Sequence, residues 1–347
     1  MGFKIIPKTV LTKWIDGLCT NYRVIGPRRK QDEYMFDEVC SATDVELDYP
    51  TTILPPKKAL APQREEIFSF KGDGGGLKPS LDSQPTVLLG VHTCDMHAIA
   101  LLDRTFGQGY ADQHYLTRRK NTTLVSIECL KPCMEHSFCK DMGTLSVPEE
   151  FDLHLTALGD EYAVDIGSEK GSALIKGLKG IREASAEDYN LVNQVMNEKW
   201  PCFTHRLKAD VTELPSLLQV GYKSTVWDEI GERCLGCASC TLVCPTCYCF
   251  NVKDEVDFSL RAGDRTRIWD SCQLDLFAVV AGGHDFRAGH ASRLRHRFSR
   301  KYKYLTDAYG LVGCVGCGRC GKSCIVHITP IDTLNALKQK VQNPMES

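Results

Sequence analysis

The sequence has no strong excess of charge of one sign and no long apolar segment. Its 42 Lys and Arg residues nearly balance its 44 Asp and Glu residues, giving a formal net charge of −2. Nucleic-acid binders usually carry a positive excess, so no nucleic-acid partner is expected. No apolar run approaches the roughly 18 residues that span a bilayer, and the first residues lack an apolar core with a cleavage site. We therefore expect neither a membrane partner nor export.

Cysteine, in contrast, is abundant, with 18 thiols in 347 residues. This share, about 5%, lies below that of small secreted domains held by disulfides. A large chain without an export signal is expected in the cytoplasm, where thiols stay reduced. Clustered reduced thiols indicate metal or redox chemistry. Because exposed iron–sulfur clusters are labile to oxygen, an anaerobic or facultatively anaerobic metabolism is expected.

The first part of the chain, residues 1–205, predicts an α/β domain with a mixed sheet covered by helices. Short apolar runs predict buried strands, and apolar residues at helical spacing predict the helix between the first two strands. Two alternating segments around Gly159-Asp160 predict a hairpin. The expected strands are 86–91, 121–129, 151–158 and 161–166, and the expected helices are 96–106, 172–178 and 186–199.

The second part, residues 206–347, predicts a mainly helical, ferredoxin-like domain that holds two [4Fe–4S] clusters. Eleven of the cysteines lie after residue 215. Segments 234–244 and 314–324 both have the spacing C-x2-C-x2-C-x3-C. A cubane cluster has four iron corners, each needing one thiolate, and two-residue spacing lets a single loop supply three of them. In two-cluster ferredoxins the fourth cysteine of this run ligates the other cluster.

This pattern predicts two ligand sets, each combining three cysteines of one motif with the last cysteine of the other. The alternatives are structural zinc and disulfides. Zinc sites usually show separated C-x2-C pairs, and two overlapping triplets would leave surplus thiols. The predicted sets are Cys234, Cys237, Cys240 and Cys324 for the first cluster, and Cys314, Cys317, Cys320 and Cys244 for the second.

Four further cysteines follow the predicted N-terminal strands, at the strand ends where ligand sites gather in α/β sheets. Their spacing matches no strict motif. A third [4Fe–4S] cluster is one interpretation, and a set of buried thiols is the other. The four candidate ligands are Cys94, Cys129, Cys133 and Cys139, and the neighbouring histidines that are alternative ligands are His92, His97 and His136.

Two other groups carry chemistry-bearing side chains. Cys247, Cys249 and Cys272 follow the first motif, and we expect them to pack as small apolar residues, with ligation as the alternative. Segment 287–303 holds seven Arg and Lys residues, while Leu294 and every fourth residue after it is apolar or aromatic. This predicts an amphipathic helix with a basic face. That face is either solvated or docks an acidic partner subunit.

Eight stretches of the chain together resemble one family, the iron–sulfur beta subunits of cytoplasmic sulfhydrogenases, which are related to an iron–sulfur subunit of anaerobic sulfite reductase. The resemblance covers nearly the whole chain. The cysteine spacing from Cys129 to Cys139, notably at Cys133, departs from the family pattern, so the resemblance does not fix the ligands of a third cluster. The stretches are Tyr34–Val39, Leu54–Lys58, Gly90–Asp95, Phe138–Gly143, Cys244–Phe250, Trp269–Cys272, Ala281–Arg287 and Tyr309–Cys320.

The resemblance implies that the chain is no complete enzyme but serves electron transfer within a larger complex. Such a subunit works beside a flavin subunit that carries FAD and handles NAD(P)H. A further subunit of hydrogenase, sulfite reductase or heterodisulfide reductase type performs the terminal chemistry. No catalytic residue is then expected in this chain. The alternative is a catalytic subunit with a substrate-accessible cluster in the N-terminal domain, and a redox sensor is a second alternative.

Overall fold

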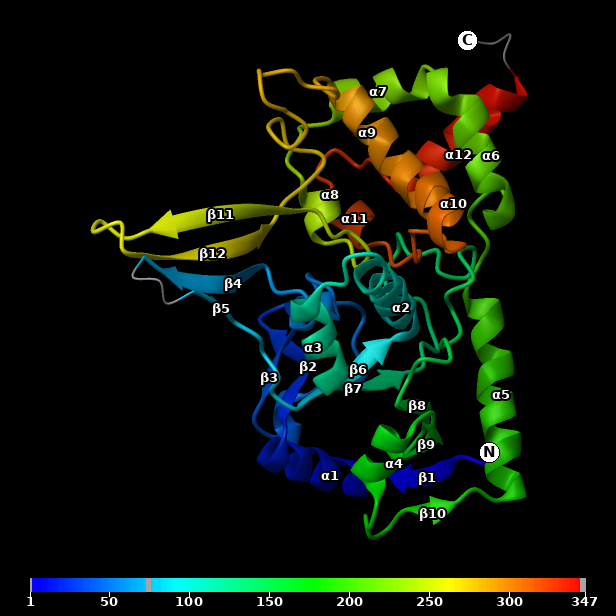
Figure 1. Ribbon diagram of the computed structural model, residues 1–347. Coiled ribbons are helices and arrows are strands. Elements are labelled where there is room, and N and C mark those ends of the chain that lie inside the picture. Colours follow the sequence, from blue (N-terminus) through cyan, green and yellow to red (C-terminus); the bar gives the residue numbers. More distant parts are fainter. Residues whose placement is uncertain (1, 73–75, 344–347) are drawn as a thin grey trace.

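A computed structural model describes residues 2–72 and 76–343. It contains a large sheet with helices on both faces, a second sheet that projects as an arm, and a helical region at the opposite end from the N-terminus (Figure 1). None of the described helices is long and apolar enough to cross a membrane.

The large sheet has eight strands in the order β10-β1-β9-β8-β7-β6-β2-β3. Its four central strands, β8, β7, β6 and β2, run parallel, and the strands on either side are antiparallel. This confirms the predicted mixed sheet. The strands are β1 (Lys4–Pro7), β2 (Arg23–Lys30), β3 (Glu33–Val39), β6 (Thr86–His92), β7 (Thr122–Ile127), β8 (Leu153–Leu158), β9 (Glu161–Ile166) and β10 (Arg182–Glu183).

Both faces of the central strands are covered, since every residue of β6 and β7 is buried. Val87 and Leu89 pack on one face of the sheet, whereas Leu88 packs on the other. Gly90 interrupts the pairing with β7, so Val91 shares the face of Leu88. Gly90 has φ +75°, which glycine adopts without steric cost. The bulge thereby aims the end of β6 at the helix that follows.

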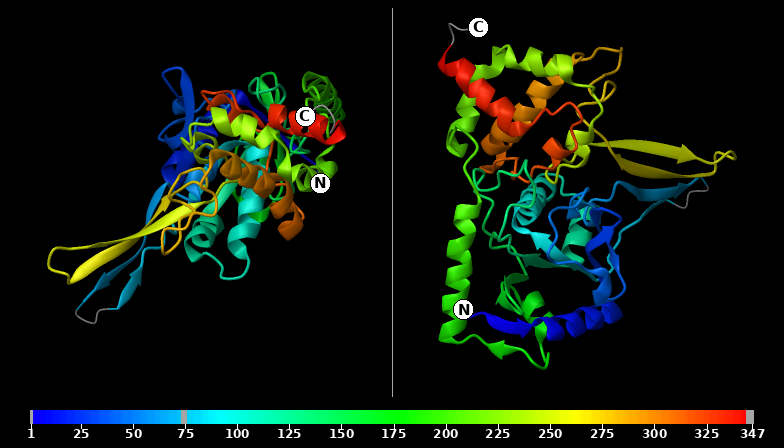
Figure 2. Two further views of the ribbon diagram at one scale, coloured as in Figure 1. Left: turned by 90° about the horizontal axis from the view of Figure 1, so that it is seen from above. Right: turned by 180° about the vertical axis from the view of Figure 1, so that it is seen from behind.

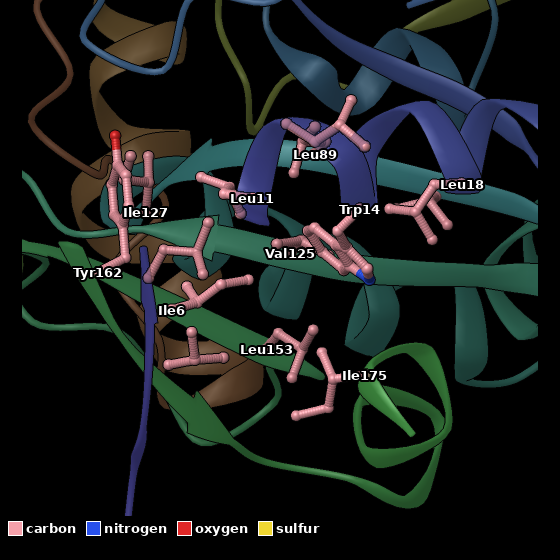
Figure 3. Close-up of a cluster of buried hydrophobic side chains, with 14 of the residues drawn as sticks. Ile6, Leu11, Trp14, Leu18, Leu89, Val125, Ile127, Leu153, Tyr162 and Ile175 are labelled. Carbon is pink, nitrogen blue, oxygen red and sulfur yellow. The ribbon is translucent and has the colours of Figure 1, made fainter. Parts of the chain in front are cut away.

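Helices on the two faces bury these strands. Helix α1 (Lys8–Asn21) covers one face, and Figure 3 shows its side chains Leu11, Trp14 and Leu18 gathered with Leu89 and Val125 of the sheet. The other face packs against α2 (Thr93–Gly107) and α3 (Gln113–Asn121). Helix α4 (Glu169–Ile175) follows β9, and α5 (Ala186–Cys202) runs along the side of the sheet towards the helical region (Figures 1 and 2). The expected strands and helices of this part are all present, although the helix expected at 172–178 spans 169–175.

The arm is an antiparallel sheet in the order β11-β12-β4-β5, and it extends away from the body of the molecule (Figures 1 and 2). Its strands are β4 (Arg64–Lys71), β5 (Leu77–Pro79), β11 (Phe250–Val256) and β12 (Ala262–Trp269). The hairpin of β11 and β12 corrects the expectation that the second part of the chain is mainly helical. Because β12 pairs with β4, the arm joins the two parts on either side of the predicted boundary at residue 205.

The helical region has its own core, in which Trp227, Phe298 and Leu337 are buried together. The rings of Trp227 and Phe298 lie 5.7 Å apart. The helices are α6 (Leu214–Val220), α7 (Val226–Arg233), α9 (His290–Ser299), α10 (Leu305–Tyr309) and α12 (Pro330–Gln342), with a π-helical turn η5 (Arg300–Tyr304) between α9 and α10. The short 3-10 turns are η1 (Ala42–Asp44), η2 (Pro56–Ala59), η3 (Val211–Glu213) and η4 (Gly221–Lys223).

Each cysteine motif forms a loop followed by one helical turn, α8 (Ser239–Leu242) in the first and α11 (Arg319–Lys322) in the second. These turns lie between the helical region and the sheet (Figure 1).

Candidate metal centres

The two motifs share their local backbone as well as their spacing. The residue before the second cysteine has positive φ in both, at Gly236 (+63°) and Gly316 (+66°). The residue directly before the helical turn has positive φ too, at Ala238 (+64°) and Gly318 (+77°). Left-handed residues reverse the chain within the loop, which wraps the three cysteines of each motif around one point.

The first predicted ligand set lines a single cavity. Cys234, Cys237 and Cys240 contribute from the first motif, and Cys324 contributes from the second. Backbone N–H groups approach two of the sulfurs, with Gly236 N 3.4 Å from Cys234 Sγ and Ile328 N 3.3 Å from Cys324 Sγ. Such N–H donors stabilise thiolates and tune the potential of a cluster. The crossed ligand arrangement remains a prediction, but these four thiols do lie around one space.

The second predicted set lies deeper. Burial raises the pKa of Cys314 to about 11 and that of Cys317 well above the usual thiol value, and Cys244 and Cys320 are close enough to influence both. The Tyr302 hydroxyl is hydrogen-bonded to Cys314. Because thiolates, not thiols, bind iron, a metal must displace protons that burial holds firmly here.

A hydrogen-bonded chain ties the end of the first motif to the start of the second. Lys301 Nζ donates to Thr246 Oγ1 over 2.5 Å, and Thr246 Oγ1 donates to the carbonyl of Gly313 over 2.5 Å. The same hydroxyl lies 3.3 Å from Cys244 Sγ. Thr246 therefore fixes the position of Cys244 against the loop that begins at Cys314.

The N-terminal thiols also gather. Cys94 begins α2 directly after β6, and Cys129 follows β7, so the parallel strands deliver both to one edge of the sheet. Cys139 packs in the same buried group as Cys94 and Cys317. Burial raises the pKa of Cys139 to about 12, and neighbouring Cys133 acts in the same direction. The third cluster remains a prediction, with its four candidate thiols on neighbouring segments.

The alternative histidine ligands lie in different surroundings. His92 is buried at the end of β6, stacks on Tyr49 with ring centroids 4.1 Å apart, and burial lowers its pKa to about 4. His97 Nε2 lies 2.9 Å from the carbonyl oxygen of Ser146. The backbone of His136 lies against Gly318 of the second motif.

A buried ion pair joins the second motif to the N-terminal thiols. Arg319 donates two hydrogen bonds to the Asp95 carboxylate, over 2.7 and 2.6 Å, and a third to the carbonyl of Thr52 over 2.9 Å. Asp95 neighbours Cys94 in the chain, and Arg319 follows Gly318 of the second motif. This pair therefore locks the two groups of thiols against each other.

Three buried cations lie among the thiols, and sequence reasoning missed their role. Arg297, Lys301 and Lys57 are buried, yet none forms an ion pair with a described carboxylate. Lys57 Nζ instead donates to the carbonyls of Cys244 (2.7 Å) and Cys247 (2.5 Å). Burying an unpaired charge is costly. The surrounding cysteines are the available anionic partners. Burial lowers the pKa values of Arg297 and Lys301, but the nearby cysteine sulfurs raise them above the usual values.

This finding corrects the expectation of a solvated basic face on segment 287–303. Arg293, Arg297 and Lys301 recur every four residues and are all buried. They precede Leu294, Phe298 and Tyr302 by one position each and share the buried side of the helix. The sequence shows the four-residue period of these cations, but it does not show that their side of the helix faces the thiols.

Cys247, Cys249 and Cys272 line a separate cavity of about 320 Å³. Cys249 and Cys272 lie close enough to act on each other, and this interaction raises the pKa of the Cys249 thiol and lowers that of Cys272. All 18 cysteines of the chain are free thiols. Within residues 2–72 and 76–343, no three Cys, His, Asp or Glu side chains converge as they would around a single metal ion.

Comparisons with known proteins agree with the cysteine geometry. Residues 233–328 match the 4Fe-4S dicluster domain family. The chain is 36% identical over 320 residues to sulfhydrogenase 2 subunit beta of Pyrococcus furiosus, an alignment that covers 89% of this chain and 91% of the relative. No solved structure matches the chain. With a 4Fe-4S dicluster domain and this near full-length similarity, the chain belongs to the family of iron–sulfur beta subunits of sulfhydrogenases.

Proposed function

We propose that this chain relays electrons between a flavin subunit that carries FAD and uses NAD(P)H and a terminal redox subunit of hydrogenase, sulfite reductase or heterodisulfide reductase type. The observation that carries the proposal is the spatial arrangement of three groups of thiols across the molecule. One group lies at the surface, a second is buried beside it, and a third lies at the edge of the sheet. When clusters are bound, each supplies a change of one electron.

The surface group, which consists of the first predicted ligand set, has the features of a site that exchanges electrons with a partner protein. Leu235 and Ile325 flank its cavity and are 57% and 74% exposed, and Cys237 is exposed as well. Exposed apolar residues around a redox centre fit a docking surface for a partner protein. We assign Leu235 and Ile325 to that contact.

The second predicted ligand set lies between the surface group and the N-terminal thiols, so the three groups form a continuous path. Cys240 and Cys320 are close enough to act on each other electrostatically, and Cys317 packs with Cys94. Neighbouring sites of this kind support one-electron steps through the protein without an acid, base or nucleophile. Arg297 and Lys301 have the task of offsetting the negative charge that accumulates between the groups.

The test uses the full chain, purified without oxygen, with and without its copurified flavin subunit. NADH or NADPH is expected to bleach the visible absorption of the clusters quickly only when the flavin subunit is present. Tight stoichiometric flavin in the chain alone, or no bleaching in the complex, would contradict the relay.

A second candidate function is a catalytic role for the N-terminal thiols, and one cavity favours it. A space of about 420 Å³ is lined by Cys129, Cys133 and His92, together with Lys8 and Lys131. It has room for a small substrate beside a cluster at this edge of the sheet.

This candidate requires a cluster at the N-terminal site. Replacing Cys94 and Cys129 together with serine is then expected to remove about four irons per chain and to abolish turnover by the complex. Loss of the irons with full turnover would exclude the catalytic role, and retention of all irons would exclude a cluster at this site.

A further inference from the structure

The cavity beside the arm is unusual because thiols and cations line it without an acidic side chain. Its volume is about 320 Å³. That space is much larger than one metal ion and suits a group of several atoms. Its chemistry-bearing lining consists of Cys247, Cys249 and Cys272 on one side and Arg297, Arg300 and Lys301 on the other.

The arm itself brings the thiols together. Phe250 at the start of β11 pairs with Trp269 at the end of β12, and Asp270 N donates to the Cys249 carbonyl over 3.0 Å. This register places Cys249 and Cys272 just outside the paired ends of the hairpin, where both line the cavity. Cys247 reaches the cavity from the end of the first motif, although the three cysteines span 26 positions of the sequence.

The cations on the other side of the cavity would stabilise an anion in this space. Arg297 is 7% exposed, and its buried Nε has no hydrogen-bond partner. Arg300 donates to the Tyr248 hydroxyl, and Lys301 to Thr246 Oγ1, both neutral groups. Arg297 and Lys301 face the predicted dicluster ligands on one side and the cysteines of this cavity on the other, so positive charge is available to an anionic group here as well. A ligand that binds sulfur and carries negative charge satisfies both sides of the cavity.

We propose that this cavity holds a further [4Fe–4S] cluster, bound by Cys247, Cys249 and Cys272, with His296 placed for the fourth iron. A cluster with three thiolates is anionic, so Arg297, Arg300 and Lys301 neutralise it. His296 is the one imidazole among the described lining residues, and a neutral ring nitrogen of histidine can ligate a metal. Binding releases the three thiol protons.

The proposal goes beyond the dicluster domain and does not depend on which partner subunits the relay serves. The new site adjoins the second predicted ligand set, because Lys57 Nζ donates to the carbonyls of both Cys244 and Cys247. The proposed site is therefore a fourth group of thiols, which lies at the base of the arm beside the second of the three groups.

The test compares two double variants of the full chain, purified without oxygen. Cys249→Ser with Cys272→Ser removes two proposed ligands, while Cys40→Ser with Cys202→Ser removes two exposed cysteines as a matched control. The first is expected to lose about four irons and four acid-labile sulfides per chain, together with one component of the EPR spectrum of the reduced protein. The control is expected to lose none.

Equal iron content in the two variants would overturn the proposal, and so would zinc at this site in the parent chain. Since the double variant can also fold poorly, His296→Gln gives an independent measurement. It is expected to keep the fold and to make about one iron per chain removable by a chelator. If the chelator removes no more iron from this variant than from the parent, and the two EPR spectra are the same, the His296 assignment is overturned. Failure of the relay would leave these iron counts unaffected.

Discussion

The two cysteine motifs have the same spacing and the same loop geometry, but their surroundings differ. In the first motif Cys237 is exposed and Leu235 projects into solvent. In the second, the equivalent Cys317 and Val315 are 8% and 4% exposed and pack against the N-terminal thiols. Spacing is therefore reflected in the backbone of the loop, while the surroundings place the first motif at the surface and the second against the N-terminal thiols.

Neighbouring backbone explains a difference in sequence between the motifs. A Cβ on Gly318 would lie 2.6 Å from the carbonyl carbon of His136, so only glycine fits. Its counterpart Ala238 has the same positive φ but lies where a Cβ is accommodated. The second motif is glycine-rich because another segment presses on it, and the first is free of that constraint.

The largest effect is expected from breaking the ion pair that anchors the second motif. Arg319→Met leaves Asp95 buried and unpaired, which should lower the free energy of unfolding by about 4 kcal/mol. The counterpart Ser239→Ala in the first motif should cost less than about 1 kcal/mol. Anaerobic denaturant titration, followed by visible absorption, compares the two. Adding Asp95→Asn should recover part of the loss, and a double variant no more stable than Arg319→Met would argue against the pair.

Gly318→Ala tests the close approach of the backbone. The left-handed conformation and the clash with His136 should together lower the free energy of unfolding by about 3 kcal/mol. Ala238→Gly, the reverse change in the first motif, should shift it by less than about 1 kcal/mol. Thermal unfolding followed by cluster absorption distinguishes the two. Similar changes in the free energy of unfolding for both variants would mean that the contact with His136 does not distinguish the second motif from the first.

Arg297→Met tests whether a cation between the motifs tunes the clusters. Reduction adds negative charge that the guanidinium stabilises, so its removal should shift at least one midpoint potential by roughly 60 mV to more negative values, a tenfold change for one electron. Arg295→Met is the matched control, because Arg295 stacks on Tyr222 at 4.4 Å. An EPR-monitored redox titration provides the measurement, and identical potentials in both variants would refute the tuning role.

The smallest effect is expected at the surface of the first motif. Leu235→Ser with Ile325→Ser should slow electron exchange with the flavin subunit or the terminal subunit about fivefold, since a few apolar contacts carry much of a docking energy. Iron content should stay unchanged. Val220→Ser, at another exposed apolar residue, is the control. Stopped-flow reduction of the complex measures the rates, and rates equal to that control would move the docking surface elsewhere.

The sequence predicted those parts whose signals are local. The apolar runs of β6 and β7 and the hairpin around Gly159 were predicted close to their observed bounds. The hairpin of β11 and β12 was missed because every residue of β11 is exposed and its Lys253-Asp254-Glu255 run looks like a solvated loop. Its stabilising partner, β4, lies nearly two hundred positions earlier in the chain.

The same limit applies to the candidate sites. Cysteine spacing is a short-range signal, so both motifs could be recognised. The burial of Arg297 and the pairing of Arg319 with Asp95 depend on segments far apart in the chain, and periodicity cannot identify their partners. These residues are identified only when the fold places the segments together.

The pairing of β4 with β12 has a consequence for how the protein is made. Residues 64–71 leave the ribosome long before residues 262–269, so β4 waits with an open edge while most of the chain is synthesised. The thiols of the first cavity are likewise incomplete until Cys324 has emerged. With the predicted ligand sets, iron loading is expected late in assembly, and a fragment that ends before the second motif is expected to lack part of the first set of ligands.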